Sequence, residues 1–265
     1  MARSLIESYE EPIDHERASG IIQRCSSNPR DVREFVLDGR DLSQVRAILD
    51  LGCGFGFMAE RLAMRAHAEA VVWGVDLCSA NRREFLRRVR STGRSARFVD
   101  MGLTHTLPWP DARFDLVACS YSLYFFPLLV PEVARVLKPG GRFMALTHTL
   151  ASQRELLRAA GISEDEGPPL VQVVSRFSAE NGLETLRPHF PKVESVFYEN
   201  TLRFGEGDFA SLATYLRFKL MLVGEGPGDS GAHSGRPVVN VERLRELVRA
   251  GLEIRKDDVA FWCTK

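Results

Sequence analysis

The sequence predicts an α/β fold built on a doubly wound, mostly parallel sheet. Two observations carry this prediction. Apolar runs end in an acid at Asp50, at Asp76 and again at Asp100, as buried parallel strands that lead into loops often do. A helical pattern follows the first two runs, and alternation of such strands with helices is typical of βαβ units.

The composition excludes several classes of protein. The 265 residues contain 35 Lys+Arg and 35 Asp+Glu, so no net charge draws the chain to nucleic acid or to an anionic membrane. The five cysteines are scattered without a C-x-x-C pair, which indicates neither a metal site nor a disulfide framework. An acidic N-terminus (Glu7, Glu10, Glu11) has no signal-peptide core. We therefore expect a cytoplasmic protein with reduced thiols and no membrane span, and we leave its oligomeric state open.

The segment from Asp50 to Gly56 is the first motif. It reads D-x-G-x-G-x-G, directly after the predicted strand 47–51 and before a predicted helix that opens near Gly56. Glycines at 52, 54 and 56 permit positive φ and let a ligand approach the bare backbone, and the helix N-terminus adds unpaired N–H groups. A dinucleotide site places its third glycine one position later, in G-x-G-x-x-G, so the spacing disfavours that class. An ordinary tight turn is the structural alternative.

The next strand, residues 70–77, places Asp76 20 residues beyond Gly56. A carboxylate at this position can accept hydrogen bonds from two ribose hydroxyls. The alternative is a cap for the helix predicted over 80–91, a task that we assign to Ser79. Residues 82–97 are rich in arginine. This region is either a patch that binds nucleic acid or, as we favour, a solvent-exposed helix face.

Further strands are predicted at 97–101, 114–119 and 142–147. A helix that ends at Lys138, followed by Pro139 and Gly140-Gly141, leads into the last of these. Residues 120–126 combine apolar side chains with hydroxyl groups. Because buried hydroxyls need hydrogen-bond partners, this segment is not simply part of the apolar core.

Two segments carry a family resemblance: the glycine turn at 50–56 and Arg135-Val136-Leu137-Lys138-Pro139-Gly140-Gly141. Together they resemble the class I S-adenosylmethionine-dependent methyltransferases, in particular the small-molecule subgroup with a type 11 methyltransferase domain. The resemblance is strong over residues 46–149. It implies a Rossmann-like methyltransferase fold with seven strands, and a C-terminal antiparallel strand pair that carries no cofactor chemistry.

The resemblance also implies the cofactor, S-adenosyl-L-methionine, with S-adenosyl-L-homocysteine as the product. Asp100 would accept from the adenine amine and Met101 would pack on its ring. The N-terminal segment would cover the cofactor, with Tyr9 and Arg17 near its aminoacid end. The full set of expected cofactor-binding residues is Asp50, Gly52, Cys53, Gly54, Gly56, Asp76, Leu77, Asp100, Met101, Ser120, Tyr121, Tyr9 and Arg17.

The expected domain organisation is a helical cap over residues 1–45 and a methyltransferase domain over 46–265. Elements within 177–255 would roof the acceptor site: a helix over 177–190, a strand over 193–204, a helix after Asp208 and a helix over 241–254. A last strand covers 259–263, and the glycine-rich stretch 224–235 is expected to be mobile.

The chemistry expected is in-line methyl transfer to a small-molecule acceptor, driven mainly by binding and orientation. His148 is the candidate general base and Tyr124 could hydrogen-bond an acceptor hydroxyl. The loops that follow the fourth and fifth strands carry no fixed charge, which predicts a pocket for a mostly uncharged acceptor. Three alternatives remain: an RNA-directed methyltransferase, a non-catalytic scaffold with the same fold, and a nicotinamide-dependent oxidoreductase.

Overall fold

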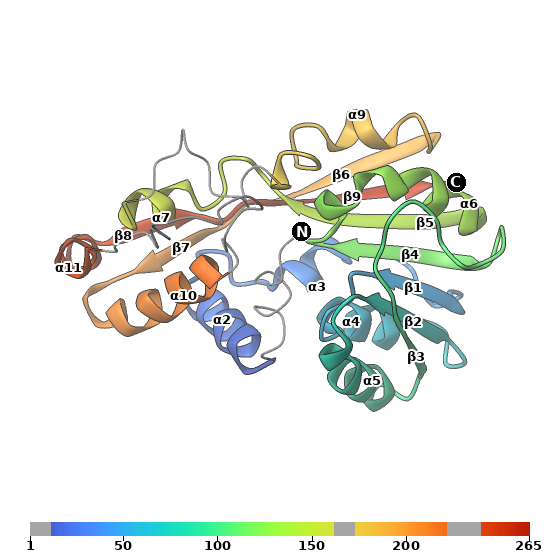
Figure 1. The fold of residues 1–265 in the computed structure, drawn as a ribbon, viewed down its shortest axis with the longest axis horizontal. Coiled ribbons are helices and arrows are strands. Elements are labelled where there is room, and N and C mark those ends of the chain that lie inside the picture. The colour runs from blue at the N-terminus through green and yellow to red at the C-terminus, as the bar shows by residue number, and fades with distance from the viewer. Residues whose placement is uncertain (1–11, 162–172, 222–239) are drawn as a thin grey trace, which may run out of the picture.

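The computed structural model describes residues 12–161, 173–221 and 240–265. A seven-stranded sheet runs through the molecule in the order β3-β2-β1-β4-β5-β9-β6 (Figure 1). Every neighbouring pair is parallel except the two that involve β9, which is the reversed strand. The strands are β1 (Ala47–Leu51), β2 (Val71–Asp76), β3 (Ser95–Asp100), β4 (Phe114–Ser120), β5 (Leu137–His148), β6 (Lys192–Tyr198) and β9 (Asp258–Thr264).

Helices cover both faces of this sheet, as a doubly wound fold requires. On one face α3 (Val32–Val36), α4 (Phe57–Arg65) and α5 (Arg82–Ser91) bury a cluster that includes Leu62 and Phe85. On the other face α6 (Val130–Val136) and α9 (Gly182–Leu186) bury Val133 and Leu186 with Phe261 of β9. The two layers lie above and below the sheet in Figure 1. The predicted fold class is confirmed.

An outer lobe at one end of the sheet has its own apolar core (Figure 1). Ala18 and Ile21 of α2 pack there with Tyr215 and Leu216 of α10. The lobe therefore joins the N-terminal helix to the C-terminal third of the chain. Its elements are α2 (Pro12–Cys25), α7 (Arg154–Ala159), β7 (Thr201–Phe204), α10 (Phe209–Met221), α11 (Val241–Arg249) and β8 (Leu252–Arg255).

Three predicted elements have different bounds. The strand expected over 193–204 is two strands in two sheets, because the corner at Asn200 is tied to the loop after α2: Asn200 Oδ1 accepts from Asn28 N at 3.2 Å. The helix expected over 241–254 ends at Arg249, where Gly251 takes φ +84° and β8 begins. The helix expected over 177–190 is confined to α9.

The fifth strand also begins earlier than expected. It starts at Leu137 rather than 142, and Leu137 pairs with Phe114 before the register shifts. Gly140 takes φ +74° within this irregular stretch, as glycine readily does. The Pro-Gly-Gly segment is thus an irregularity within the strand rather than a turn before it.

Candidate functional site

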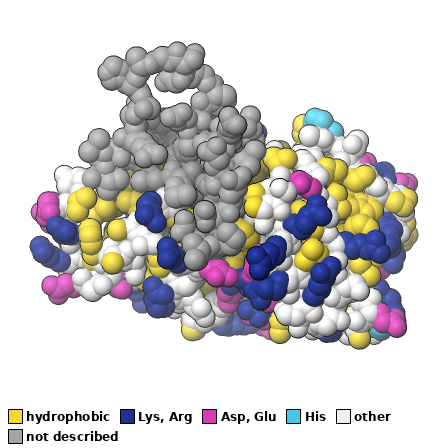
Figure 2. All heavy atoms as spheres, turned by 60° about the horizontal axis from the view of Figure 1, so that its bottom comes forward, with side chains coloured by type: hydrophobic (Ala, Val, Ile, Leu, Met, Phe, Trp, Pro, Cys, Tyr) yellow, Lys and Arg dark blue, Asp and Glu magenta, His cyan; other side chains and the backbone are white. Residues whose placement is uncertain are grey.

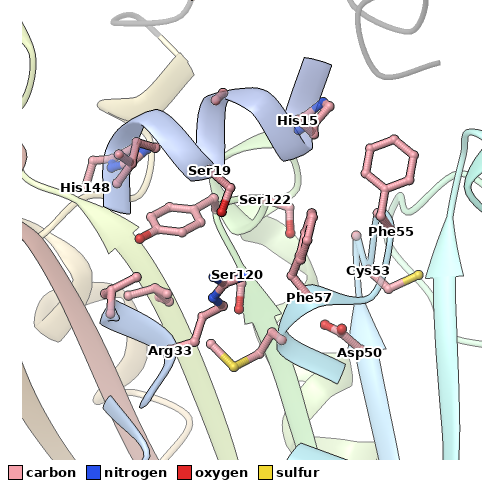
Figure 3. Close-up of a pocket in the computed structure, with 18 of the residues that line it drawn as sticks. His15, Ser19, Arg33, Asp50, Cys53, Phe55, Phe57, Ser120, Ser122 and His148 are labelled. Carbon is pink, nitrogen blue, oxygen red and sulfur yellow. The ribbon is translucent and has the colours of Figure 1, made fainter. Parts of the chain in front are cut away.

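A cavity of about 610 Å³ opens at the carboxyl edge of β1, β2, β4 and β5. Residues of the outer lobe close it from above: His15, Ser19 and Ile22 of α2 and Phe218 and Lys219 of α10. Figure 3 shows Asp50, Ser120 and Ser122 beneath α2. The volume lies within the ~300–1,000 Å³ range of small-molecule sites, and the carboxyl edge is where α/β sheets bind ligands.

The glycine turn forms one wall of this cavity, and its three glycines differ in what surrounds them. Gly54 lines the cavity at φ +47°, and a Cβ there would meet only open space. Gly52 also lines it, but a Cβ there would collide with the Ser122 side chain at about 2.5 Å. Gly56 instead packs against Phe85 and does not line the cavity. The bare backbone that a ligand could approach is therefore at Gly52 and Gly54.

Asp76 lies at the end of β2 and holds the glycine turn. Its Oδ2 accepts from Gly54 N at 2.8 Å, and its Oδ1 accepts from Cys78 N and Asn81 Nδ2. The helix cap that we expected from Ser79 is not formed, since neither the 3-10 turn Ser79–Asn81 nor α5 has a side-chain cap. Burial raises the pKa of Asp76, and these hydrogen bonds oppose the rise. These three donors use three of the roughly four acceptor sites of the carboxylate, so Oδ2 can still accept one ribose hydroxyl.

Two predicted residues lie buried behind the turn. Asp50 is 2% exposed and lines the cavity; burial first, then repulsion from Asp76, raises its pKa to about 8. Cys53 also lines it as a buried thiol, and burial raises its pKa. At neutral pH Asp50 is therefore largely a protonated acid, able to donate a hydrogen bond as well as accept one.

The side of the cavity predicted to hold adenine is apolar. Leu77 and Met101 line it, with Leu103 beside them. Asp100 is exposed at the end of the edge strand β3 and is not among the residues that line the cavity. The adenine contact proposed for Asp100 thus has no support from its position, while Leu77 and Met101 are placed to pack on a ring.

Ser120 and Tyr121 follow β4, as predicted, and both line the cavity. Ser120 Oγ is buried and has no hydrogen-bond partner in the described part of the chain, so a bound ligand could satisfy it. Tyr121 takes φ +56°, an uncommon conformation for a large residue, and its ring stacks on His148 at 4.5 Å. Tyr124 is buried and also lines the cavity.

His148, at the end of β5, belongs to a buried polar network that sequence reasoning missed. Its Nδ1 lies 2.6 Å from Oδ1 of Asp258, while Oδ2 accepts from Tyr121 Oη at 3.0 Å and Lys256 Nζ at 2.8 Å. Antiparallel pairing of β5 with β9 places Asp258 directly opposite His148. The acids and the lysine just before the last predicted strand were the available signal, since an antiparallel strand begins where its neighbour ends.

Charges in this network shift each other's pKa. Burial alone would raise the pKa of Asp258, but Lys256 and His148 outweigh it and hold that pKa at about 2. Burial lowers the pKa of His148 despite the opposing pull of Asp258. At neutral pH the pair is therefore a carboxylate and a neutral imidazole, not two charged groups.

Two residues of the N-terminal segment, Tyr9 and Arg17, were expected near the aminoacid end of the cofactor. Tyr9 lies outside the described residues, as does the stretch 224–235. Arg17 is exposed and lines a separate hollow between α2 and α10, not the cavity. Arg33 of α3 lines the cavity instead, in an ion pair with Asp31 at 2.5 Å.

The prediction of an uncharged pocket is wrong. Lys219 and Lys256 both line the cavity. The loops after β4 and β5 are free of fixed charge, as predicted; Lys219 comes from α10 in the roof, and Lys256 from the segment before β9, which lies beside the end of β5.

The arginine-rich region has partners within the chain. Arg88 contacts Glu16, Glu60 and Glu84, and Arg87 also pairs with Glu84. On the face in Figure 2, Lys and Arg side chains are interspersed with Asp and Glu. Such a mixed surface is that of a solvated helix face. No group of three or more His, Cys, Asp or Glu in the described residues could hold a metal ion. None of the described helices is long and apolar enough to cross a membrane.

Comparisons with known proteins agree with this geometry. Residues 48–141 match the model of a family described as "Methyltransferase domain". The fatty-acid O-methyltransferase of Mycolicibacterium smegmatis is 38% identical over 102 residues, which cover 37% of this chain and 36% of that protein. The malonyl-[acyl-carrier protein] O-methyltransferase of Halorhodospira halophila is 35% identical over 135 residues, 48% of this chain and 44% of that protein. The chain thus spans less than half the length of these two relatives.

Among solved structures, the YcgJ protein of Bacillus subtilis superimposes with a TM-score of 0.54 at 16% identity, covering 95% of this chain and 98% of that one. At this identity the likeness concerns the fold. The matched range contains both predicted signatures, the glycine turn at 50–56 and residues 135–141, and it disfavours the nicotinamide-dependent alternative. Gly52, Gly54, Asp76 and Met101 fit S-adenosylmethionine, the cofactor of such domains, because they offer open backbone, an acceptor for a ribose hydroxyl and an apolar ring surface. Residues 48–141 are thus a methyltransferase domain, of the kind that class I S-adenosylmethionine-dependent methyltransferases contain.

Proposed function

We propose that the protein methylates a hydroxyl oxygen of a small, largely apolar molecule, with His148 as general base. The observation that carries this proposal is the 2.6 Å contact between His148 Nδ1 and Asp258 Oδ1 at the cavity wall. Since Asp258 is a carboxylate, it accepts the Nδ1 proton and fixes the tautomer. The lone pair of the neutral ring is then on Nε2.

The position of Nε2 supports this role. Across the described ranges 12–161, 173–221 and 240–265, no hydrogen bond to Nε2 is formed, and the atom is not sealed from the cavity. The stacked ring of Tyr121 and its bond to Asp258 restrain the imidazole further. A base that is held in one orientation and neutral at pH 7 suits removal of a hydroxyl proton, a contribution of typically 10²–10⁴ in rate.

The remaining steps concern binding and orientation. When bound, S-adenosylmethionine would supply an electrophilic methyl group for the acceptor oxygen and would leave as a neutral thioether. His148 takes the hydroxyl proton at Nε2. We assign the ribose to Asp76, the adenine to Leu77 and Met101, and the open backbone contact to Gly54. The buried aromatic wall, which includes Tyr124, excludes water from the reacting atoms.

The two relatives named above are both O-methyltransferases, which supports oxygen as the methylated atom. The site offers no support for RNA as acceptor, because the cavity lining is mainly apolar and Arg88 is paired with three acids. A purely structural scaffold is disfavoured by the His148–Asp258 pair, for which binding alone has no use.

The test uses S-adenosylmethionine labelled in its methyl group and a metabolite extract as the source of acceptors. Wild-type protein should release S-adenosylhomocysteine and transfer label to an extract component. His148→Gln should bind S-adenosylhomocysteine as the wild type does but lose about 10²–10⁴ of the turnover. His189→Gln, a change at an exposed histidine outside the cavity, is the matched control and should be fully active. Equal turnover by His148→Gln would remove His148 from the mechanism.

A further inference from the structure

Lys219 is a cation in the roof of the cavity whose charge the proposed chemistry does not use. It lies on α10, lines the cavity, and holds its Nζ 5.6 Å from the ring centre of Tyr215 and 5.8 Å from that of Phe218. The two rings thus lie next to the ammonium group of Lys219. Among the described residues no carboxylate lies within ion-pair distance of Nζ.

The acid near Lys219, Asp258, already has hydrogen-bond partners. Asp258 accepts from Tyr121, Lys256 and His148, so its two oxygens hold three donors. The guanidinium groups of Arg30 and Arg33, which also line the cavity, have their own acids in Asp38 and Asp31. Burial, and then repulsion from Lys256, lower the pKa of Lys219 to about 7. A cation in this position is unfavourable until an anion arrives beside it.

The rest of the cavity is apolar. Side chains that line it include Ile22, Phe55, Phe57, Phe125, Phe126 and Leu146. An acceptor that fills this space would be mostly hydrocarbon or aromatic, with one anionic group near α10 and one nucleophilic group near His148. On this side of the cavity a protonated amine would instead meet two lysines, Lys219 and Lys256, and the neighbouring acid, Asp258, already holds three donors.

We propose that Lys219 recognises a carboxylate of the acceptor, so that the substrate is an apolar hydroxy acid rather than a neutral alcohol. This rests on the proposed function, because it assumes that the acceptor occupies the space between α10 and His148. The same carboxylate chemistry could also come from the aminoacid end of the cofactor, and the experiment must separate these two sources.

The experiment measures binding by calorimetry to protein saturated with S-adenosylhomocysteine. The probes are 3-hydroxybutyrate, 3-hydroxydecanoate and 4-hydroxyphenylacetate, each paired with its neutral amide of the same shape. In the wild type at least one acid should bind tenfold or more tightly than its amide. Lys219→Met should abolish this preference while affinity for S-adenosylhomocysteine, measured separately, changes less than twofold.

Arg217→Met is the matched control, because it removes an exposed positive charge from the same helix outside the cavity; it should keep the preference of the wild type. Two results would overturn the inference: no acid preferred by the wild type, or loss of S-adenosylhomocysteine affinity in Lys219→Met, which would assign the cation to the cofactor. Failure of the proposed function is distinct, because it would appear as wild-type turnover in His148→Gln, whatever the preference between acid and amide.

Discussion

Asp258→Asn is the substitution that probes the buried network most sharply. The change keeps the shape of the side chain but removes the negative charge that neutralises Lys256. Lys256 is only 5% exposed. Breaking one partner of a buried ion pair costs about 3–5 kcal/mol, because the other charge is left uncompensated. For a chain of this size each kcal/mol lowers Tm by about 2–4 °C, so we expect a fall of roughly 6–20 °C.

The same substitution should also affect the chemistry. An amide can present N–H to Nδ1 of His148, which places the ring proton on Nε2 and removes the lone pair that faces the acceptor. In a serine protease triad the equivalent change lowers turnover by ~10⁴ for this reason. We expect a loss of order 10²–10⁴ in turnover, with S-adenosylhomocysteine affinity unchanged.

A double variant separates the two effects. Lys256→Met with Asp258→Asn removes the orphaned charge, so Tm should recover most of the loss while turnover stays low. Scanning calorimetry gives Tm, and release of S-adenosylhomocysteine gives turnover. If Asp258→Asn leaves both Tm and turnover at wild-type values, the network neither stabilises the fold nor orients the base, and the reasoning from its geometry is refuted.

Three further predictions concern the cofactor side. Asp76→Asn should weaken S-adenosylhomocysteine binding by about 1.5–3 kcal/mol, the range for a hydrogen bond to a charged group, as titration calorimetry can measure; unchanged affinity would leave Asp76 as a holder of the turn only. Gly54→Ala should lower both Tm and cofactor affinity, since its Cβ projects into the cavity at φ +47°, whereas Gly93→Ala, at φ +79° in open space outside the cavity, should lower Tm alone. Asp50 has a folded pKa of about 8 against 3.8, so the folded state retains its proton and wild-type stability falls as pH rises between about 4 and 8. Asp50→Asn has no such group to titrate, so the Tm of this variant should rise relative to that of the wild type as pH increases from about 4 to about 8. A Tm difference that does not change with pH would mean that Asp50 is ionised in the folded protein.

Local sequence patterns were sufficient for the sheet and for one side of the cavity. The strand that ends at Asp50 and the glycines that follow it are contiguous, so their position relative to each other follows from backbone geometry. His148 was predictable for a similar reason, since the carboxyl ends of parallel strands share one edge.

The roof was not predictable because it depends on contacts between distant segments. Lys219 enters the cavity only because α10 packs on α2, and that packing is set by an apolar cluster shared across nearly 200 residues of chain. Asp258 required knowledge that β9 runs antiparallel beside β5. Asp100 has the same sequence signal as Asp76, but it ends an edge strand and is exposed outside the cavity, a difference that the local pattern does not contain.

The central claim is that the cavity beside the glycine turn binds S-adenosylmethionine. Its most direct test is isothermal titration of the full chain with S-adenosylhomocysteine, which needs no acceptor. We predict one site with micromolar or tighter affinity, corresponding to at least ~8 kcal/mol of binding free energy. No measurable heat at millimolar ligand, with the protein folded by circular dichroism, would contradict the claim.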